Sequence, residues 1–306
     1  MNNIAYYNGK ESLLEDMMIP ATDRGYYFGD GVYDATVVRH HKLFALDEHL
    51  DRFWRSMDAV MITPDFTKDE LATLLNRLSS KVSNETYMVY WQVTRGSGER
   101  HHSFPKDAKP NLFVTITPMT VTREAQTRDF RIQTEEDIRS YMAHVKTLNL
   151  LPNVLSAQRA AEAGVDETVY YRICADGSTR VTEGSHTNVH MIKDGKLVTA
   201  PTDKLILPGI ARVHLLQAAR DLGMPVEERA FTKEELLTAD EVFITSSLLF
   251  AGRVVSIDGQ AAGQKAGELF IPLRERLIDE WFEETKSCLK KWHTSIARKC
   301  YARYIT

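Results

Sequence analysis

The sequence predicts an α/β protein of two domains, a small α+β N-terminal domain followed by a larger α/β C-terminal domain. Segments with the apolar spacing of helices alternate with apolar runs typical of strands along the whole chain. A polar, threonine-rich stretch around Pro118–Arg128 separates them into two groups. The 306 residues suffice for two packed cores. The expected divisions are residues 1–118, a linker at 119–128, the second domain at 129–285 and an extension at 286–306.

The N-terminal domain is expected to begin with a hairpin and to contain two helices. Asn8-Gly9 is a dipeptide typical of two-residue hairpin turns. Asp47 is expected to cap a helix whose apolar residues recur at helical spacing as far as Met57. Thr67–Glu70 has the capping-box pattern that begins a second helix. Further strands are expected at Ala35–Val38, Lys42–Leu46, Tyr87–Thr94 and Asn111–Thr117.

The C-terminal domain is expected to alternate strands with helices. Asp176-Gly177 and Asp194-Gly195 predict turns, because both residue types tolerate turn conformations. Thr232–Glu235 is a second capping box. The expected helices span about 148–163, begin near Gly209 and follow Gly267, and the expected strands include 130–134, 225–229 and 241–245.

Composition excludes several classes of protein. The net charge of −4 gives no basic surface for nucleic acid, and no apolar run approaches the ~20 residues that span a membrane. The three cysteines, Cys174, Cys288 and Cys300, lack metal-ligand spacing, and the N-terminus lacks a signal-peptide pattern. We therefore expect a cytoplasmic protein without a metal site.

The tail 286–306 is basic, and we interpret it as a solvated extension, with a partner-binding helix as the alternative.

Four segments contain candidate functional residues. Asp23–Asp34 holds three glycines within seven residues and ends beside Tyr33. Arg52 lies early in a predicted helix, where its planar guanidinium suits a phosphate. A cationic loop with Arg100, His101 and His102 leaves a buried strand. The fourth region contributes Lys146, Glu183, Ile210, Ala211, Ser246 and Ser247.

Each of these residues taken alone would be interpreted as structural, since charged and aromatic side chains of this kind are common on surfaces and in cores. The order of the motifs carries the argument. They are Arg-Gly-Tyr-x-Phe-Gly-Asp-Gly-Val-Tyr, Glu-His-x-Asp-Arg, Val-Lys-x-Leu-Asn and Thr-Glu-Gly-Ser-x-x-Asn. In this order, from about Tyr7 to Gly259, the chain resembles the fold-type IV pyridoxal phosphate (PLP) aminotransferases, most closely their bacterial D-amino acid branch. Asp34, His186 and Asn188 are secondary candidates for which a structural role is favoured.

The resemblance implies a cofactor held between two domains, with 129–285 as the cofactor-binding domain. Lys146 is expected to form the Schiff base with the PLP aldehyde, and Glu183 to pair with the pyridine nitrogen. The phosphate is expected to bind Arg52, the hydroxyl groups of Ser246 or Ser247, and the backbone amides of Ile210 and Ala211 at a helix N-terminus. Ala211 departs from the threonine that is common in the D-specific branch.

The resemblance also implies a substrate and an assembly. Tyr33, Arg100 and His102 match the residues that hold the α-carboxylate in D-specific members, although His101 is an alternative to His102. In the family this loop reaches the site from the other subunit, so a homodimer is expected. The expected reaction moves the amino group of a D-amino acid such as D-alanine to a 2-oxo acid such as 2-oxoglutarate by a ping-pong mechanism. The alternatives are a branched-chain L-amino acid aminotransferase, an aminodeoxychorismate lyase and a catalytically silent homologue.

Overall fold

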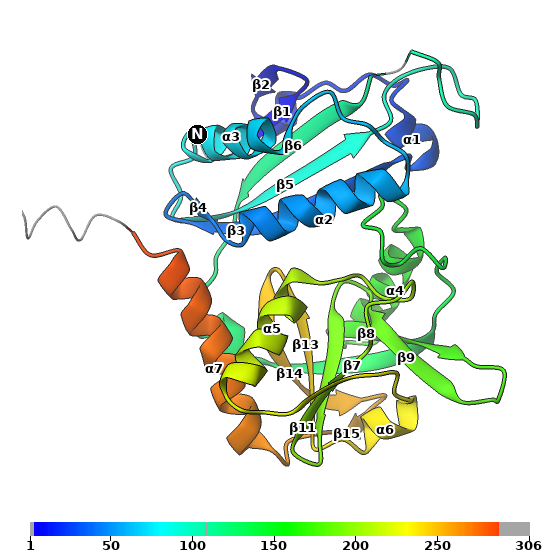
Figure 1. Cartoon of the computed structure of the whole chain (residues 1–306), viewed down its shortest axis with the longest axis vertical. Helices are drawn as coiled ribbons and strands as arrows, with labels where there is room; N and C mark the ends of the chain where they lie inside the picture. Colours follow the sequence, from blue (N-terminus) through cyan, green and yellow to red (C-terminus); the bar gives the residue numbers. More distant parts are fainter. Residues whose placement is uncertain (1–2, 108, 288–306) are drawn as a thin grey trace, which may run out of the picture.

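The computed structural model describes residues 3–107 and 109–287 of the chain. It contains two β-sheets, one formed by the first 118 residues and the other beginning at residue 129. Helices pack on each sheet, which gives the mixed α/β architecture that the sequence predicts (Figure 1). No helix within the described ranges is long and apolar enough to cross a membrane.

The first sheet has six antiparallel strands in the order β2-β1-β6-β5-β3-β4. Its long central strands are β3 (Gly31–Arg39), β5 (Thr86–Thr94) and β6 (Asn111–Pro118). The edge strands are β1 (Ile4–Tyr7), β2 (Lys10–Ser12) and β4 (Lys42–Leu43). Asn8 and Gly9 turn between β1 and β2 with φ of 44° and 92°, which confirms the predicted hairpin.

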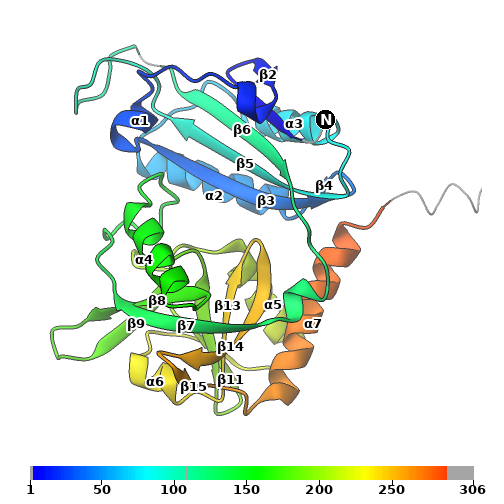
Figure 2. The ribbon, with the colours of Figure 1, turned by 180° about the vertical axis from the view of Figure 1, so that it is seen from behind.

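Two helices cover one face of the first sheet. α2 (Leu46–Ala59) and α3 (Lys68–Ser79) lie in front of it in Figure 1, and Figure 2 shows its opposite face without a helix across the long strands. Leu50, Phe53 and Trp91 are fully buried between the helices and the sheet. Two shorter helical turns complete this half, α1 (Arg24–Phe28) and η1 (Leu14–Asp16).

One helix start in this half differs from the prediction. α2 begins at Leu46 with Ala45 as its N-cap, so Asp47 lies in the first turn rather than at the cap. The Ala45 backbone is left-handed, with φ of 49°, because the chain must turn sharply out of the β3–β4 hairpin. The carboxylate of Asp47 still complements the helix dipole from within the first turn. The capping box of Thr67 and Glu70 is confirmed.

The second sheet has nine strands, with the path β12-β11-β10-β13-β14-β7-β8-β9 and β15 paired to β14. The pairs β14–β7, β7–β8 and β11–β12 are parallel, and the other pairs are antiparallel. The strands are β7 (Asp129–Glu136), β8 (Glu167–Ile173), β9 (Thr179–Gly184), β10 (Asn188–Lys193), β11 (Lys196–Thr199), β12 (Val226–Glu228), β13 (Glu241–Ser246), β14 (Leu249–Ile257) and β15 (Gln260–Ala261).

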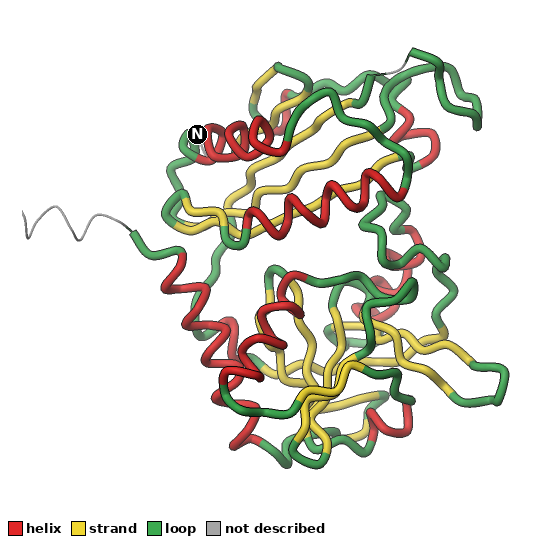
Figure 3. The backbone as a smooth tube through the Cα atoms, viewed as in Figure 1, coloured by secondary structure: helices red, strands yellow, loops and turns green. Residues whose placement is uncertain are grey.

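Helices flank the second sheet on different sides, as the tube in Figure 3 shows. α5 (Ile210–Asp221) and α7 (Gly267–Glu284) pack together over a core that contains Leu215, Phe270 and Trp281. α6 (Lys233–Leu237) begins with the predicted capping box of Thr232 and Glu235. The remaining helical segments are α4 (Leu151–Glu162) and η2 (Ala125–Thr127).

Helix α4 is shorter than the predicted 148–163. It begins at Leu151 because Leu148 and Asn149, which precede it, are engaged by the first half of the chain. The Leu148 amide donates to Gly31 O at 3.1 Å, and Asn149 Nδ2 donates to Gly29 O at 3.0 Å. A tertiary contact therefore replaces the first helical turn and ties the segment before α4 to the start of β3.

The segment that connects the two sheets crosses beside α7 (Figure 2). Val121 is buried in the core beneath α5 and α7, and that same core includes Val37 of β3. Gln126 is buried, and its side-chain amide makes two hydrogen bonds to the backbone near the β13–β14 turn. It donates to Leu248 O and accepts from the Phe250 amide. The connection is thus packed against the second half of the chain.

Most of the basic extension predicted for 286–306, with Cys288 and Cys300, lies outside the described residues.

Candidate active site

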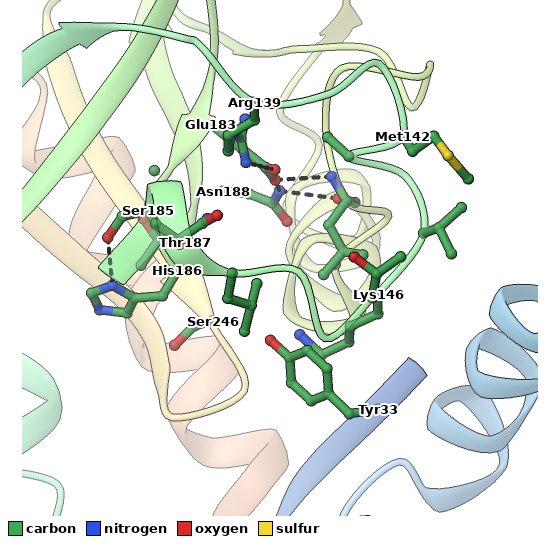
Figure 4. Close-up of a pocket in the computed structure, with 18 of the residues that line it drawn as sticks. Tyr33, Arg139, Met142, Lys146, Glu183, Ser185, His186, Thr187, Asn188 and Ser246 are labelled. Carbon is green, nitrogen blue, oxygen red and sulfur yellow. Dashed lines mark hydrogen bonds and ion pairs between the residues drawn. The ribbon is translucent and has the colours of Figure 1, made fainter. Parts of the chain in front are cut away.

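A cavity of about 300 Å³ lies where the two halves of the chain meet. Figure 4 shows Lys146 and Tyr33 on one side of it, and Glu183 with Arg139 and Asn188 on another. Eight of the ten site residues chosen from the sequence line this cavity, namely Tyr33, Arg52, Lys146, Glu183, Ile210, Ala211, Ser246 and Ser247. Arg100 and His102 do not line it.

Lys146 is held by its backbone against the first sheet. The Tyr33 amide donates to Lys146 O at 2.9 Å, and the Lys146 amide donates to Ser56 Oγ at 3.3 Å. The ammonium nitrogen lies 4.3 Å from the centre of the Tyr33 ring, within range of a cation–π contact. Among the described residues no carboxylate pairs with this nitrogen, so the amine is available to a ligand in the cavity.

Glu183 stands at the end of β9 and is almost fully buried. Its two oxygens accept from three donors: Arg139 Nη1 at 2.7 Å, Asn188 Nδ2 at 3.0 Å and the Leu207 amide at 2.9 Å. Burial raises the pKa of the Glu183 carboxyl, and the Arg139 guanidinium and the Leu207 amide oppose that rise. The three donors fix the orientation of the carboxyl group at the cavity wall.

Arg139 is a cavity residue that the sequence analysis did not select. It follows β7 and is held by Asp137, whose carboxylate accepts from Arg139 Nε at 3.0 Å and Nη2 at 2.9 Å. Three acidic residues and an Arg that follow a predicted strand are a weak signal, because such residues are common on surfaces. Only the fold brings Arg139 next to Glu183.

Arg52 projects from α2 and is buried, in contact with the buried side chains of Asp34 and His49. Its Nε and Nη2 donate to Asp34 at 2.9 and 2.7 Å, while Nη1 donates to Pro208 O at 3.2 Å. His49 Nδ1 lies 2.8 Å from Asp34. Although burial alone would raise it, the pKa of the Asp34 carboxyl is held well below its ordinary value by Arg52 and His49. Asp34 therefore anchors Arg52 as an ion pair at the cavity edge.

The N-terminus of α5 opens onto the same cavity. Gly209 is its N-cap and has no side-chain cap, so the first amides of the helix, including those of Ile210 and Ala211, have no partner within the helix. Unpaired amides and the positive end of the helix dipole suit an anion. A Cβ atom on Gly209 would lie 2.0 Å from Asn188 Oδ1. Glycine is therefore required where this helix meets the residue that holds Glu183.

Ser246 and Ser247 complete this wall at the turn between β13 and β14. Ser246 Oγ accepts from the amides of Leu248 and Leu249, both at 3.2 Å, which sets the turn. The preceding residue, Thr245, also lines the cavity. Two serines and the start of α5 thus lie on one side of the pocket.

Arg100 and His102 lie on an exposed loop that follows β5. Both approach the ring of Phe28, with the Arg100 guanidinium carbon and the His102 ring centre each 5.3 Å from its centre. Arg24 holds the loop backbone through a 2.6 Å bond to His101 O. Within one chain, these two residues and Tyr33 do not form a single pocket.

The chain matches one protein family over most of its length. The family model described as amino-transferase class IV covers residues 31–257. The chain belongs to this family. Class IV aminotransferases depend on pyridoxal phosphate, and this chain is a pyridoxal phosphate-dependent aminotransferase.

Relatives of known name cover nearly the whole chain. A D-alanine aminotransferase of Bacillus licheniformis is 37% identical over 260 residues, which are 85% of this chain and 90% of the relative. One from Listeria monocytogenes is 37% identical over 270 residues, 87% of this chain and 92% of the relative. One from Staphylococcus aureus is 34% identical over 272 residues, 88% of this chain and 95% of the relative.

Solved structures share the fold at lower identity. The branched-chain amino acid aminotransferase of Escherichia coli superposes with a TM-score of 0.80 at 22% identity, covering 94% of this chain and 97% of its own. The fold IV transaminase of Curtobacterium pusillum has a TM-score of 0.74 at 21% identity, covering 88% and 93%. These similarities establish fold-type IV and carry no information about substrate.

The cavity has the groups that pyridoxal phosphate requires. An amine without an acidic partner, that of Lys146, suits the aldehyde. The buried carboxyl of Glu183, which accepts three hydrogen bonds, suits a protonated ring nitrogen. The uncapped α5 N-terminus, with Arg52 nearby, suits a phosphate dianion. Among the described residues no group of three or more potential metal ligands occurs.

Proposed function

We propose that this chain is a D-amino acid transaminase that takes the amino group from a small D-amino acid such as D-alanine and passes it to a 2-oxo acid such as 2-oxoglutarate. The observation that carries the proposal is the set of D-alanine aminotransferases, 34–37% identical, that match over at least 85% of the chain. The branched-chain aminotransferase named above is a structural neighbour at 22% identity, which concerns the fold.

We assign the cofactor roles as follows. When bound, the cofactor supplies an aldehyde carbon for an amine and a ring that withdraws the electron pair left on the substrate Cα. Lys146 would hold the aldehyde through its side-chain nitrogen and, once the substrate amine has taken its place, that nitrogen would carry the proton that leaves the substrate Cα. Both tasks need the unprotonated amine, and a paired carboxylate would favour the ammonium form instead. Among the described residues no carboxylate pairs with the side-chain nitrogen of Lys146.

The other cavity residues hold and orient. Glu183 pairs with the ring nitrogen, for which its three donors keep it in one orientation. The phosphate binds the amides of Ile210 and Ala211, the guanidinium of Arg52 and the hydroxyl groups of Ser246 or Ser247. Ala211 contributes only its backbone, because its methyl group offers no hydrogen bond.

We propose that a second copy of the chain completes the substrate site. Tyr33 lines the cavity, whereas Arg100 and His102 lie outside it on an exposed loop. A partner subunit that presents this loop would give the carboxylate a bidentate guanidinium and two single donors. Large apolar side chains are exposed near the cavity, and such side chains are typical of a surface that another protein subunit covers. They are Ile138, Tyr141, Leu151 and Val154.

We propose that the two sheets mark the two domains, 1–118 and 129–285, with 119–128 between them. The cytoplasmic location rests on the cysteine content, and within the described residues Cys174 is a free, partly buried thiol.

A spectral titration tests the function. The purified protein, loaded with pyridoxal phosphate, is mixed in parallel with D-alanine, L-alanine and L-leucine without an acceptor. The proposal expects D-alanine to bleach the visible absorbance of the cofactor and 2-oxoglutarate to restore it, as ping-pong transfer requires. Bleaching by L-leucine alone would assign the branched-chain activity instead. Pyruvate release from aminodeoxychorismate without an acceptor would assign the lyase, and no spectral response to any substrate would indicate a silent homologue. Lys146→Ala is the matched control.

A further inference from the structure

Asp137 is a buried carboxylate outside the cavity with an unusual number of donors. It follows directly after β7, and its side chain has no exposed surface. One oxygen accepts from the Arg139 amide and Nε, both at 3.0 Å. The other accepts from Arg139 Nη2 at 2.9 Å, from Thr182 Oγ1 at 3.0 Å and from Arg172 Nε at 3.4 Å. Such a carboxylate is satisfied only while it is ionised.

These bonds leave Arg139 a single orientation. Two of its guanidinium nitrogens, Nε and Nη2, are held by Asp137, and the third, Nη1, donates to Glu183 at 2.7 Å. The guanidinium carbon lies 4.4 Å from the centre of the Tyr170 ring. Because all three nitrogens are engaged, the direction in which Nη1 points is set by the fork on Asp137.

The cluster contains as many acidic groups as cations. Arg139 pairs with both Asp137 and Glu183, and Arg172 pairs with Asp137. Arg172 Nη2 also donates to Arg139 O at 2.8 Å, so it fixes the backbone of the same segment. Replacing Asp137 with a neutral group would leave an excess positive charge behind Glu183, on the side of the cavity where a protonated ring nitrogen is proposed to bind.

We infer that Asp137 is a positioning residue for the cofactor, acting through Arg139 on Glu183 to orient that carboxylate and to offset the guanidinium charge beside the ring nitrogen. The inference rests on the proposed cofactor role of Glu183. Asp137 itself does not line the cavity. Its effect is transmitted by the Arg139 guanidinium, which is bonded to both carboxylates.

Asp137→Asn tests the inference with two measurements on the full chain. The first is the midpoint of the pH titration of the bound cofactor's visible absorbance, and the second is the dissociation constant of pyridoxal phosphate. With the negative charge gone, protonation of the cofactor is disfavoured, so we expect the midpoint to fall by about one pH unit. We expect cofactor affinity to fall about tenfold, since a charge-assisted fork is lost.

Thr182→Val is the matched control. It removes the neutral donor that lies 3.0 Å from Asp137 Oδ2, the oxygen that also accepts from Arg139 Nη2. The negative charge of Asp137 and its two bonds to the Arg139 guanidinium remain. We expect it to leave the midpoint unchanged. An unchanged midpoint and affinity in Asp137→Asn, or an equal shift in Thr182→Val, would overturn the inference.

Asp137→Glu replaces the first variant if Asp137→Asn does not fold. The longer side chain keeps the charge and displaces the fork, so we expect an unchanged midpoint and a severalfold weaker affinity. Affinity equal to wild type would overturn the positioning role. Wild-type protein that binds no pyridoxal phosphate at Lys146 would instead refute the proposed function, so the two failures are distinguishable.

Discussion

Asn188 Oδ1 lies 2.0 Å from the point that a Cβ atom on Gly209 would occupy. Asn188 donates through Nδ2 to Glu183 at 3.0 Å and to Leu207 O at 3.1 Å, so it cannot move away without losing both bonds. The contact joins the start of α5, where we propose that the phosphate binds, to the carboxylate proposed for the ring nitrogen. One glycine thus lets the two ends of the cofactor site approach each other.

Gly209→Ala is therefore expected to weaken cofactor binding. The added methyl group displaces Asn188 and costs Glu183 a hydrogen bond to a charged group, worth about 1.5 kcal/mol or roughly tenfold in the dissociation constant. Fluorescence titration of the apoprotein with pyridoxal phosphate measures it. Gly267→Ala is the control, because its Cβ would meet the end of the flexible Arg253 side chain at 3.2 Å and Ile271 Cδ1 at an ordinary contact distance of 3.8 Å. Equal affinity for both variants and wild type would contradict the prediction.

Arg52→Gln is expected to destabilise the apoprotein as well as weaken cofactor binding. It leaves the fully buried Asp34 without its bidentate cation, and breaking a buried ion pair in this way costs about 3 kcal/mol or more. Urea unfolding without cofactor measures the change in the free energy of unfolding. Arg55→Gln makes the same substitution at an exposed site one turn along α2 and should leave stability nearly unchanged. Similar urea midpoints for the two variants would contradict the view that the Arg52–Asp34 ion pair stabilises the fold.

Hybrid dimers test whether Arg100 acts in the partner's site. Arg100→Ala alone should lower kcat/KM for D-alanine at least tenfold, because a charge-assisted anchor of about 1.5 kcal/mol or more is lost. Lys146→Ala alone should be inactive. If the loop crosses between subunits, a hybrid of the two variants has one intact site, and random mixing restores about a quarter of wild-type activity.

The outcome depends only on which subunit supplies the loop. When Arg100 serves the cavity of its own chain, no hybrid site is intact and mixing restores nothing. Activity is measured after joint unfolding and refolding of tagged variants, with each variant refolded alone as the control.

His214 should make stability depend on pH above neutrality. It lies 3.2 Å from Glu48 of α2 and 3.0 Å from Glu280 of α7, and so connects the two halves of the chain. Burial opposes protonation, but the bonds to Glu280 and Glu48 outweigh it and raise the pKa of His214 to about 10. The folded-state pKa exceeds the unfolded value of about 6.5, so the stabilisation is complete below that value and is lost as pH rises toward 10.

The melting temperature of the apoprotein should therefore fall between about pH 7 and 10, and His214→Gln should flatten that decline. His40→Gln, in the β3–β4 turn, is the control. An equally steep decline in His214→Gln and wild type would show that the ion pairs between the halves of the chain do not contribute.

Local chemistry made many elements of this protein predictable from sequence. The Asn8-Gly9 turn and both capping boxes depend on neighbouring residues alone, and each occurs where the pattern placed it. Ordered motifs likewise identified the family, and eight of the residues chosen from the sequence line one cavity. Helix starts were less secure. Asp47 has the residue type of a cap, but the turn out of the β3–β4 hairpin decides where α2 begins.

Relations between distant segments were decided only by the tertiary structure. The bond from Arg139 to Glu183 joins residues 44 positions apart, and Arg52 meets Pro208 across 156 positions. No local pattern encodes such contacts, because they depend on how two sheets pack, and an arginine after a strand is usually solvated. The sequence by itself determined the kinds of groups that the site contains. Folding decided which of them meet within one chain, and it left Arg100 and His102 outside the cavity.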